Sequence, residues 1–262
     1  MKDKRKLFGI ITTILAIVLL WNIIIFGWMR YNPKIEKLNK AIKNEDLDAV
    51  IELLETGLDP NIPDARDNLL SSLCEDGADY PLIVAGGARN YEIYKTLFDY
   101  GATVEVPEET GRSTIYPVIC TRYEPSTFSI VKLLIEKGAD TSMEGGGVKL
   151  VFTAAEIPPA YRGEIHVIDG KLVFDYNEDV AKEITEIVIM LLGDESVNIT
   201  TDWNQSLLMQ AAESENIYLV KYLLSNGCDP KIVDKAGKTA LDFAVDTGNQ
   251  QVIDLITAAL EE

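Results

Sequence analysis

The sequence contains a repeated unit that cannot bury its own apolar residues. In the clearest copy, Leu208 to Asn216 predicts a short helix, and Tyr218 to Asn226 predicts a longer one with leucine and valine on one face. Gly227 then closes the pair, because glycine reaches a positive φ without a Cβ clash. A lone helical hairpin leaves its apolar face in water, so it needs copies of itself on both sides.

The spacing of leucines and glycines reveals those copies. Leu208 precedes Gly227 by nineteen residues, and the same separation joins Leu38 to Gly57 and Leu82 to Gly101. Fourteen residues beyond a closing glycine, the next apolar helix begins, as from Gly101 to Ile115, from Gly138 to Phe152 and from Gly227 to Leu241. We therefore predict about six units in register, which together make a repeat domain over residues 35–262.

The segments around the glycines resemble the ankyrin repeat, whose pattern is roughly G-x-T-P-L-H-x-A, a second helix, and L-L-x-x-G-A-D. The matching stretches are Pro81-Leu82, Val131-Lys-Leu-Leu134, Gly138-Ala-Asp140, Gly227-Cys-Asp-Pro230 and Gly237-Lys-Thr-Ala-Leu241. The resemblance implies an all-α repeat solenoid of helical hairpins with β-turn tips. It also implies that the tips and the concave face, lined by the first helices, bind other proteins.

A long apolar run precedes the repeats. After a basic tail at residues 1–6, residues 7–28 (Leu7 to Trp28) carry no formal charge, and residues 29–34 form a short linker. As a helix, this run is about 33 Å long, enough to cross a hydrocarbon core of about 30 Å. We predict a single-pass transmembrane helix that acts as a signal anchor, with a cleaved signal peptide as the alternative. The basic tail favours a cytoplasmic N-terminus, which places the repeats on the opposite side.

The fourth unit is interrupted at residues 157–178. Within this insertion, Asp169-Gly170 is a favoured two-residue turn between two alternating segments, so we predict a β-hairpin. Alternation places Ile165, Val167, Leu172, Phe174 and Tyr176 on one face. We expect that apolar face to be buried, either against the helices of its own repeat or against the surface of a partner.

The charge balance is strongly acidic, with 24 Lys and Arg against 42 Asp and Glu. Such a chain repels phosphate backbones, so we do not expect nucleic-acid binding. The excess negative charge either keeps the protein soluble or attracts a basic protein partner.

The sequence offers little for catalysis. His166 is the single histidine, and three scattered cysteines make neither a disulfide framework nor a cysteine-rich zinc site. The chain also lacks the glycine-rich phosphate loops of nucleotide-binding proteins. We therefore predict no enzymatic activity, no cofactor, no metal and no small-molecule substrate.

Partner-binding residues are predicted at the turn tips and on the first helices. Trp203 is the leading candidate, because an aromatic residue at a tip has little core to fill and aromatic residues are favoured interface anchors. Packing on the next repeat is the alternative role for Trp203. The other candidates are Asp64, Asp67, Glu108, Glu109, Asp202 and Lys235 at the tips, and Tyr116 and Met209 on the first helices.

Three hypotheses of function follow. The first is a membrane-anchored protein-interaction module. The second is an inhibitor or immunity-type protein whose acidic face blocks a basic toxin or enzyme. The third is an enzyme or sensor whose active part is the hairpin insertion with His166.

Overall fold

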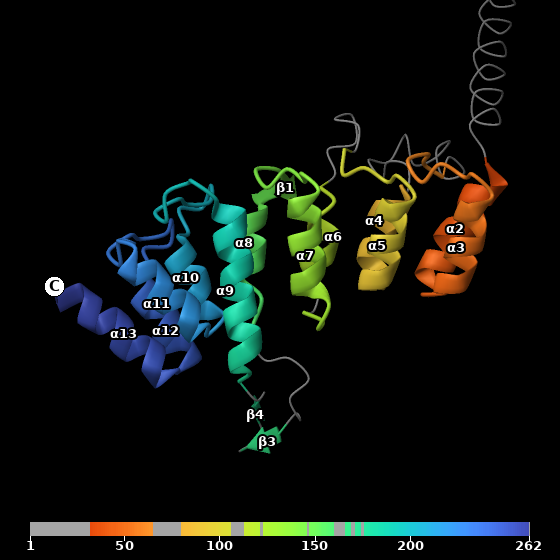
Figure 1. Ribbon diagram of the computed structural model, residues 1–262. Coiled ribbons are helices and arrows are strands. Elements are labelled where there is room, and N and C mark those ends of the chain that lie inside the picture. Colours follow the sequence, from red (N-terminus) through yellow and green to blue (C-terminus); the bar gives the residue numbers. More distant parts are fainter. Residues whose placement is uncertain are drawn as a thin grey trace, which may run out of the picture. The chain divides into compact units, whose positions relative to one another are not determined.

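The computed structural model describes residues 32–64, 80–105, 113–120, 123–145, 147–159, 166–168, 171–173 and 176–261 (Figure 1). These residues form helices joined by turns, with two small β-hairpins. The chain divides into two compact units, residues 1–103 and residues 104–262. Each unit is described by itself.

The described part of the first unit contains two helix pairs, formed by α2 (Pro33–Lys43) with α3 (Leu47–Glu55) and by α4 (Pro81–Ala88) with α5 (Tyr91–Asp99). The first helices α2 and α4 pack on each other, and so do the second helices α3 and α5. Their contact surfaces hold fully buried apolar residues, among them Ile35, Leu38, Ile93 and Leu97. Each pair thus buries its apolar side against the other.

The second unit continues the pattern over a longer stretch. Its described elements are α6 (Tyr116–Ile119), α7 (Thr127–Glu136), β1 (Glu144–Gly145), β2 (Val148–Lys149), α8 (Leu150–Ala155), β3 (His166–Ile168), β4 (Lys171–Val173), α9 (Glu178–Leu192), α10 (Leu207–Glu213), α11 (Ile217–Ser225), α12 (Ala240–Thr247) and α13 (Gln250–Glu261). The helices alternate between a first and a second member of each pair, as the sequence repeat predicts.

Two rows of helices make up this second unit (Figure 1). The first helices α6, α8, α10 and α12 contact one another in order, and the second helices α7, α9, α11 and α13 do the same. Leu208, Leu219 and Leu223 are fully buried between the rows. The predicted all-α stack of helical hairpins is therefore confirmed by the packing of the described helices.

Capping residues and glycines explain why the helices begin and end at these positions. Many first turns are capped by a polar side chain, as where Asn216 Oδ1 accepts a hydrogen bond from the N–H of Leu219 at 3.1 Å. Gly227 follows the end of α11 with φ of 80°, a conformation that other residues adopt only with strain. The Cys228 N–H then donates to the Leu223 carbonyl at 3.0 Å. This closure turns the chain towards the next unit.

Asparagine side chains link the loops of successive units. The Asn198 amide donates to the carbonyl of Gly227 at 3.1 Å, and its oxygen accepts from the N–H of Asp229 at 2.7 Å. In the first unit, Asn61 makes the same two bonds, to the carbonyl of Gly101 and from the N–H of Thr103, both at 2.9 Å. A single side chain thus satisfies both a donor and an acceptor in the closing turn of the next repeat.

The predicted hairpin in the insertion is confirmed. Strands β3 and β4 are antiparallel, and Ile168 pairs with Lys171, which leaves two residues for the turn. Val167 pairs with Leu172, so these two positions share a face as predicted. The hairpin lies beyond the ends of the helices, on the side opposite β1 (Figure 1).

The predicted transmembrane segment, residues 7–28, lies outside the described residues, as do the basic tail and residues 29–31 of the linker. Among the residues that the structure describes, no helix combines the length and the apolar character that a membrane span requires.

Replacing Asn198 with alanine should destabilise the second unit by about 1–3 kcal/mol, because two hydrogen bonds between loops are lost. Urea unfolding followed by circular dichroism measures this change. Asn226→Ala is the matched control, because the Asn226 amide bonds to the carbonyl of Tyr222 at the end of its own helix. An equal loss in both variants would contradict a special role for the links between loops.

Candidate functional site

The turn before α10 presents Trp203 at its tip. The N–H of Asn204 donates to the carbonyl of Thr201 at 2.8 Å, and the N–H of Thr201 donates to the carbonyl of Gln205 at 3.0 Å. Asn204 takes a positive φ of 59°, which asparagine tolerates better than most residues. These bonds hold the tip in a defined turn, and the Trp203 side chain is 68% exposed.

The next turn supports this tip directly. The N–H of Lys235 donates to the Trp203 carbonyl at 3.0 Å, and the Asn204 amide donates to the carbonyl of Val233 at 2.6 Å. The Lys235 Nζ lies 5.4 Å from the centre of the Trp203 ring, within the range of a cation–π interaction. We call Asp202, Trp203, Val233 and Lys235 the tip surface.

The tip surface has the composition of a protein contact. Trp203 and Val233 are among the few large apolar side chains that are exposed in the described residues, and Val233 is 46% exposed. Asp202 and Lys235 add one charge of each sign and are also exposed. A rigidly held aromatic residue with a polar rim is the usual arrangement of an interface anchor. Three of the predicted site residues, Asp202, Trp203 and Lys235, are thus brought together.

The other predicted site residues are placed differently or lie outside the described residues. Asp64 is half-buried at the end of a described segment of the first unit, and Tyr116 is half-buried at the start of α6. Asp67, Glu108 and Glu109 lie outside the described residues.

Met209 needs a correction, because its side chain is fully buried and cannot contact a partner. It is the third residue of α10, and its sulfur accepts a hydrogen bond from the N–H of Ser206 at 3.4 Å. The prediction put this position at the edge of the concave face, whereas the helix turns it into the core.

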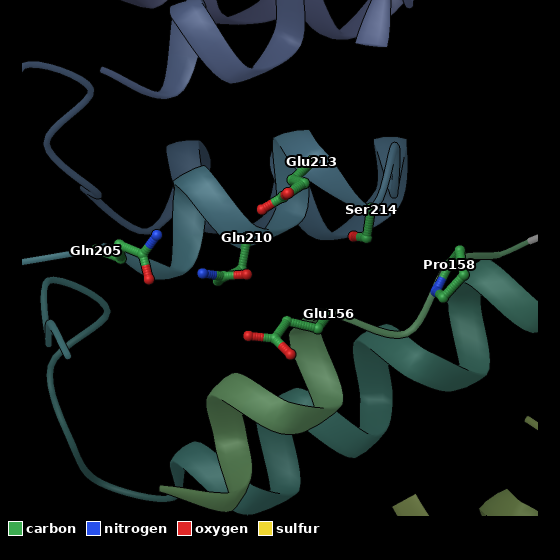
Figure 2. Close-up of a pocket in the computed structure, with 6 residues that line it drawn as sticks. All are labelled: Glu156, Pro158, Gln205, Gln210, Glu213 and Ser214. Carbon is green, nitrogen blue, oxygen red and sulfur yellow. The ribbon is translucent and has the colours of Figure 1, made fainter. Parts of the chain in front are cut away.

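A second candidate feature is a groove between the ends of α8 and α10, which sequence reasoning missed. Its volume is about 460 Å³, and it is lined by Glu156, Pro158, Gln205, Gln210, Glu213 and Ser214. Figure 2 shows Glu156, just after α8, facing the side chain of Gln210 on α10, with Glu213 one turn further along the same helix. We call this feature the acidic groove.

The electrostatics of the acidic groove favour a positive charge. Burial, together with the nearby negative charge of Glu213, raises the pKa of Glu156 above its ordinary value. Both carboxylates also stand at helix C-termini, where carbonyl groups without helical partners add negative potential. Two like charges are therefore held near each other at some cost to stability.

The two carboxylates could have been found by aligning the repeats. Leu150-Val-Phe-Thr-Ala-Ala-Glu156 and Leu207-Leu-Met-Gln-Ala-Ala-Glu213 are seven-residue segments that end in the same Ala-Ala-Glu. Because acidic residues are abundant throughout the chain, neither glutamate stands out alone. Their equivalent positions in adjacent first helices are the informative signal.

The comparisons with known proteins support the repeat interpretation. Residues 179–260 match the family model described as ankyrin repeats, in three copies. A putative ankyrin repeat protein of Fowlpox virus, FPV115, is 23% identical over 229 residues, which cover 81% of this chain and 42% of that protein. The fold of the described helix pairs is the ankyrin-repeat solenoid.

Solved structures agree on the fold. The ankyrin repeat domain of human ASB11 matches with a TM-score of 0.58 at 19% identity, covering 85% of this chain and 82% of that one. A chain from the complex of the endopeptidase Bd0816 of Bdellovibrio bacteriovorus with the immunity protein Bd3460 matches with a TM-score of 0.57 at 20% identity. That match covers 85% of this chain and 97% of the other.

One similar protein is an enzyme, the NAD-capped RNA hydrolase NUDT12 of Homo sapiens. It is 38% identical over 63 residues, which cover 24% of this chain and 14% of that protein. A match of this extent transfers no hydrolase activity to this chain. The chain thus spans less than half the length of both FPV115 and NUDT12. The relatives support the interpretation of a non-enzymatic repeat protein.

Replacing Glu156 with glutamine should stabilise the folded chain at neutral pH. A carboxyl whose pKa is raised by folding binds its proton more tightly in the native state, so its ionisation lowers stability as pH rises above the unfolded pKa of about 4.3. The gain should therefore be present at neutral pH and vanish below about pH 4, where the carboxyl is protonated in both states.

Urea unfolding at the two pH values measures this difference. Glu186→Gln is the control, since Glu186 is an exposed residue of α9 that does not line the groove. A gain in stability for Glu156→Gln that persists unchanged at acid pH would contradict the electrostatic explanation.

Proposed function

We propose that this chain is a membrane-anchored module that binds a partner protein through the tip surface. The observation that carries the proposal is the exposure of Trp203, which is 68% accessible although its turn is fixed by hydrogen bonds from two successive repeats. An aromatic side chain has only two rotatable bonds to immobilise, and a turn held by hydrogen bonds loses little backbone freedom on binding, which favours affinity. The ankyrin-repeat fold provides the rigid support for such a surface.

The membrane part of the proposal is based on residues 7–28, which carry no formal charge and are rich in isoleucine and leucine. Trp28 ends the apolar run and Tyr31 follows it, at positions suited to a membrane interface. The basic tail orients the N-terminus towards the cytoplasm, with the repeats on the opposite side. Confinement to a membrane raises the effective concentration of the module for partners on that surface.

The second candidate function is an inhibitor that blocks a basic enzyme or toxin. Two observations favour it, the excess of 42 acidic over 24 basic residues and the similarity in fold to a chain from an endopeptidase–immunity protein complex. An acidic surface of this kind speeds association with a basic partner. An inhibitor would form a stable complex with one enzyme, whereas an interaction module would join several membrane-associated proteins.

Trp203→Ala should weaken partner binding about tenfold or more, because truncation of an anchor residue removes its buried contact area. Chemical crosslinking of the full chain in its native membranes, followed by mass spectrometry, measures the partner yield. Val245→Ala is the matched control, because Val245 is an apolar side chain of α12 that is 58% exposed. Undiminished crosslinking by Trp203→Ala would contradict the tip surface as the binding site.

Placing arginine at both Ile17 and Leu20 should release the chain from membranes. Each arginine at the centre of a membrane span costs about 2.5–3.5 kcal/mol on insertion scales. Fractionation of cells after extraction at alkaline pH distinguishes integral from peripheral association. Full retention of the double variant in the membrane pellet would show that residues 7–28 are not the anchor.

A further inference from the structure

Three successive first helices have an acidic residue at the same position of the repeat, in or just after their last turn. Glu156 follows α8, Glu213 ends α10, and Asp246 is the seventh residue of α12, as Glu213 is of α10. Since α8, α10 and α12 pack side by side in one row, these acids follow that row of helix ends. The three carboxylates can therefore be compared as equivalent sites.

Among the described residues, one of the three carboxylates forms an ion pair with a cation. The Lys238 Nζ lies 2.7 Å from Asp246 Oδ2, where it forms an ion pair. Within the described part of the chain, neither Glu156 nor Glu213 forms an ion pair. Among the residues that the structure describes, the two carboxylates of the acidic groove therefore have no counterpart to the Lys238 charge that pairs with Asp246.

A buried amide also points into the acidic groove. Gln210 is only 3% exposed, and Figure 2 shows its side chain directed into the space between α10 and Glu156. Its amide makes no hydrogen bond with any residue that the structure describes. Because the amide faces the groove, its donors and its acceptor are available to a group that enters the groove. Ser214, by contrast, donates to the carbonyl of Ala211 at 3.4 Å.

We propose that the acidic groove binds the guanidinium group of an arginine side chain from the partner protein. The inference rests on the proposed protein-binding function and names the chemistry of the contact. The Glu156 and Glu213 carboxylates accept hydrogen bonds from the guanidinium, and the Gln210 amide oxygen accepts a third. The groove, at about 460 Å³, has room for the side chain with part of its backbone.

Arginine fits this set of acceptors better than lysine. Its planar guanidinium carries five N–H donors in a fixed fork, which can serve acceptors on two helices at once. A lysine ammonium is a compact charge that remains strongly hydrated and would satisfy fewer of the separated acceptors. Charge-assisted hydrogen bonds of this kind are about twice as strong as neutral ones.

The test is a nuclear magnetic resonance titration of the isotope-labelled full chain with the capped peptide Ac-Gly-Arg-Gly-NH2. The matched probes are the same peptide with lysine and with citrulline, which has the shape of arginine but no charge. We expect the arginine peptide to shift the side-chain amide signals of Gln210, with weaker binding by the lysine peptide and none by the citrulline peptide.

The variants Glu213→Gln and Gln210→Leu should each weaken binding of the arginine peptide, Glu213→Gln by about tenfold because it removes a charge-assisted contact. The control is Asp246→Asn, which changes the equivalent acid of the next repeat and should leave this binding unchanged. Equal binding of the citrulline peptide, or an equal loss in Asp246→Asn and Glu213→Gln, would overturn the proposal.

The experiments distinguish failure of the proposed arginine site from failure of the proposed binding through the tip surface. If the arginine peptide does not bind but partner crosslinking still depends on Trp203, the groove proposal is wrong and the interaction module stands. If the peptide binds as expected but no partner is crosslinked, the groove chemistry is supported and the tip surface is contradicted.

Discussion

The structure depends on the packing of each helix pair against its neighbours. A pair such as α10 and α11 is too short to bury its leucines alone, so Leu208, Leu219 and Leu223 reach zero exposure only between adjacent pairs. Because first helices contact first helices and second helices contact second helices, the stack has two different rows. The row of first helices places repeat-equivalent residues next to one another, and the candidate functional surfaces arise from this repetition.

The turns between helix pairs stabilise the stack and also form the candidate binding surface. Asn61 and Asn198 occupy corresponding positions and link their loops to the closing glycine of the next repeat. The same stacking brings Lys235 to the carbonyl and the ring of Trp203, so the next repeat holds the backbone of this loop tip. Such fixed positions reduce the entropy lost on binding. At the other ends of the first helices, Glu156 and Glu213 are held together despite their like charge, a cost that a bound cation would offset.

Much of the fold could be predicted from the sequence, because the closing glycines and the apolar helix starts recur at constant spacing. The second helix of the interrupted unit begins at the end of the predicted insertion, as α9 (Glu178–Leu192). Asp169-Gly170 likewise predicted the register of the hairpin between β3 and β4.

The candidate site was harder to predict. Met209 was placed on the surface because spacing shows which residues belong to a helix but not how the helix is rotated against its neighbours. Glu156 and Glu213 were missed because their proximity comes from packing between repeats, in a chain where acids are common. Trp203 and Lys235 could be placed at turn tips because turn chemistry is local, although their mutual contact is visible only in the structure.

Hydrogen exchange of the full chain, measured by mass spectrometry with and without the crosslinking partner, tests most directly how the repeats bind. The account predicts slower exchange in the turns at residues 199–206 and 231–238 and at the ends of α8 and α10, with little change in the second helices α9 and α11. Slower exchange confined to α9, α11 and α13 would contradict it, since binding would then use the opposite row of the stack.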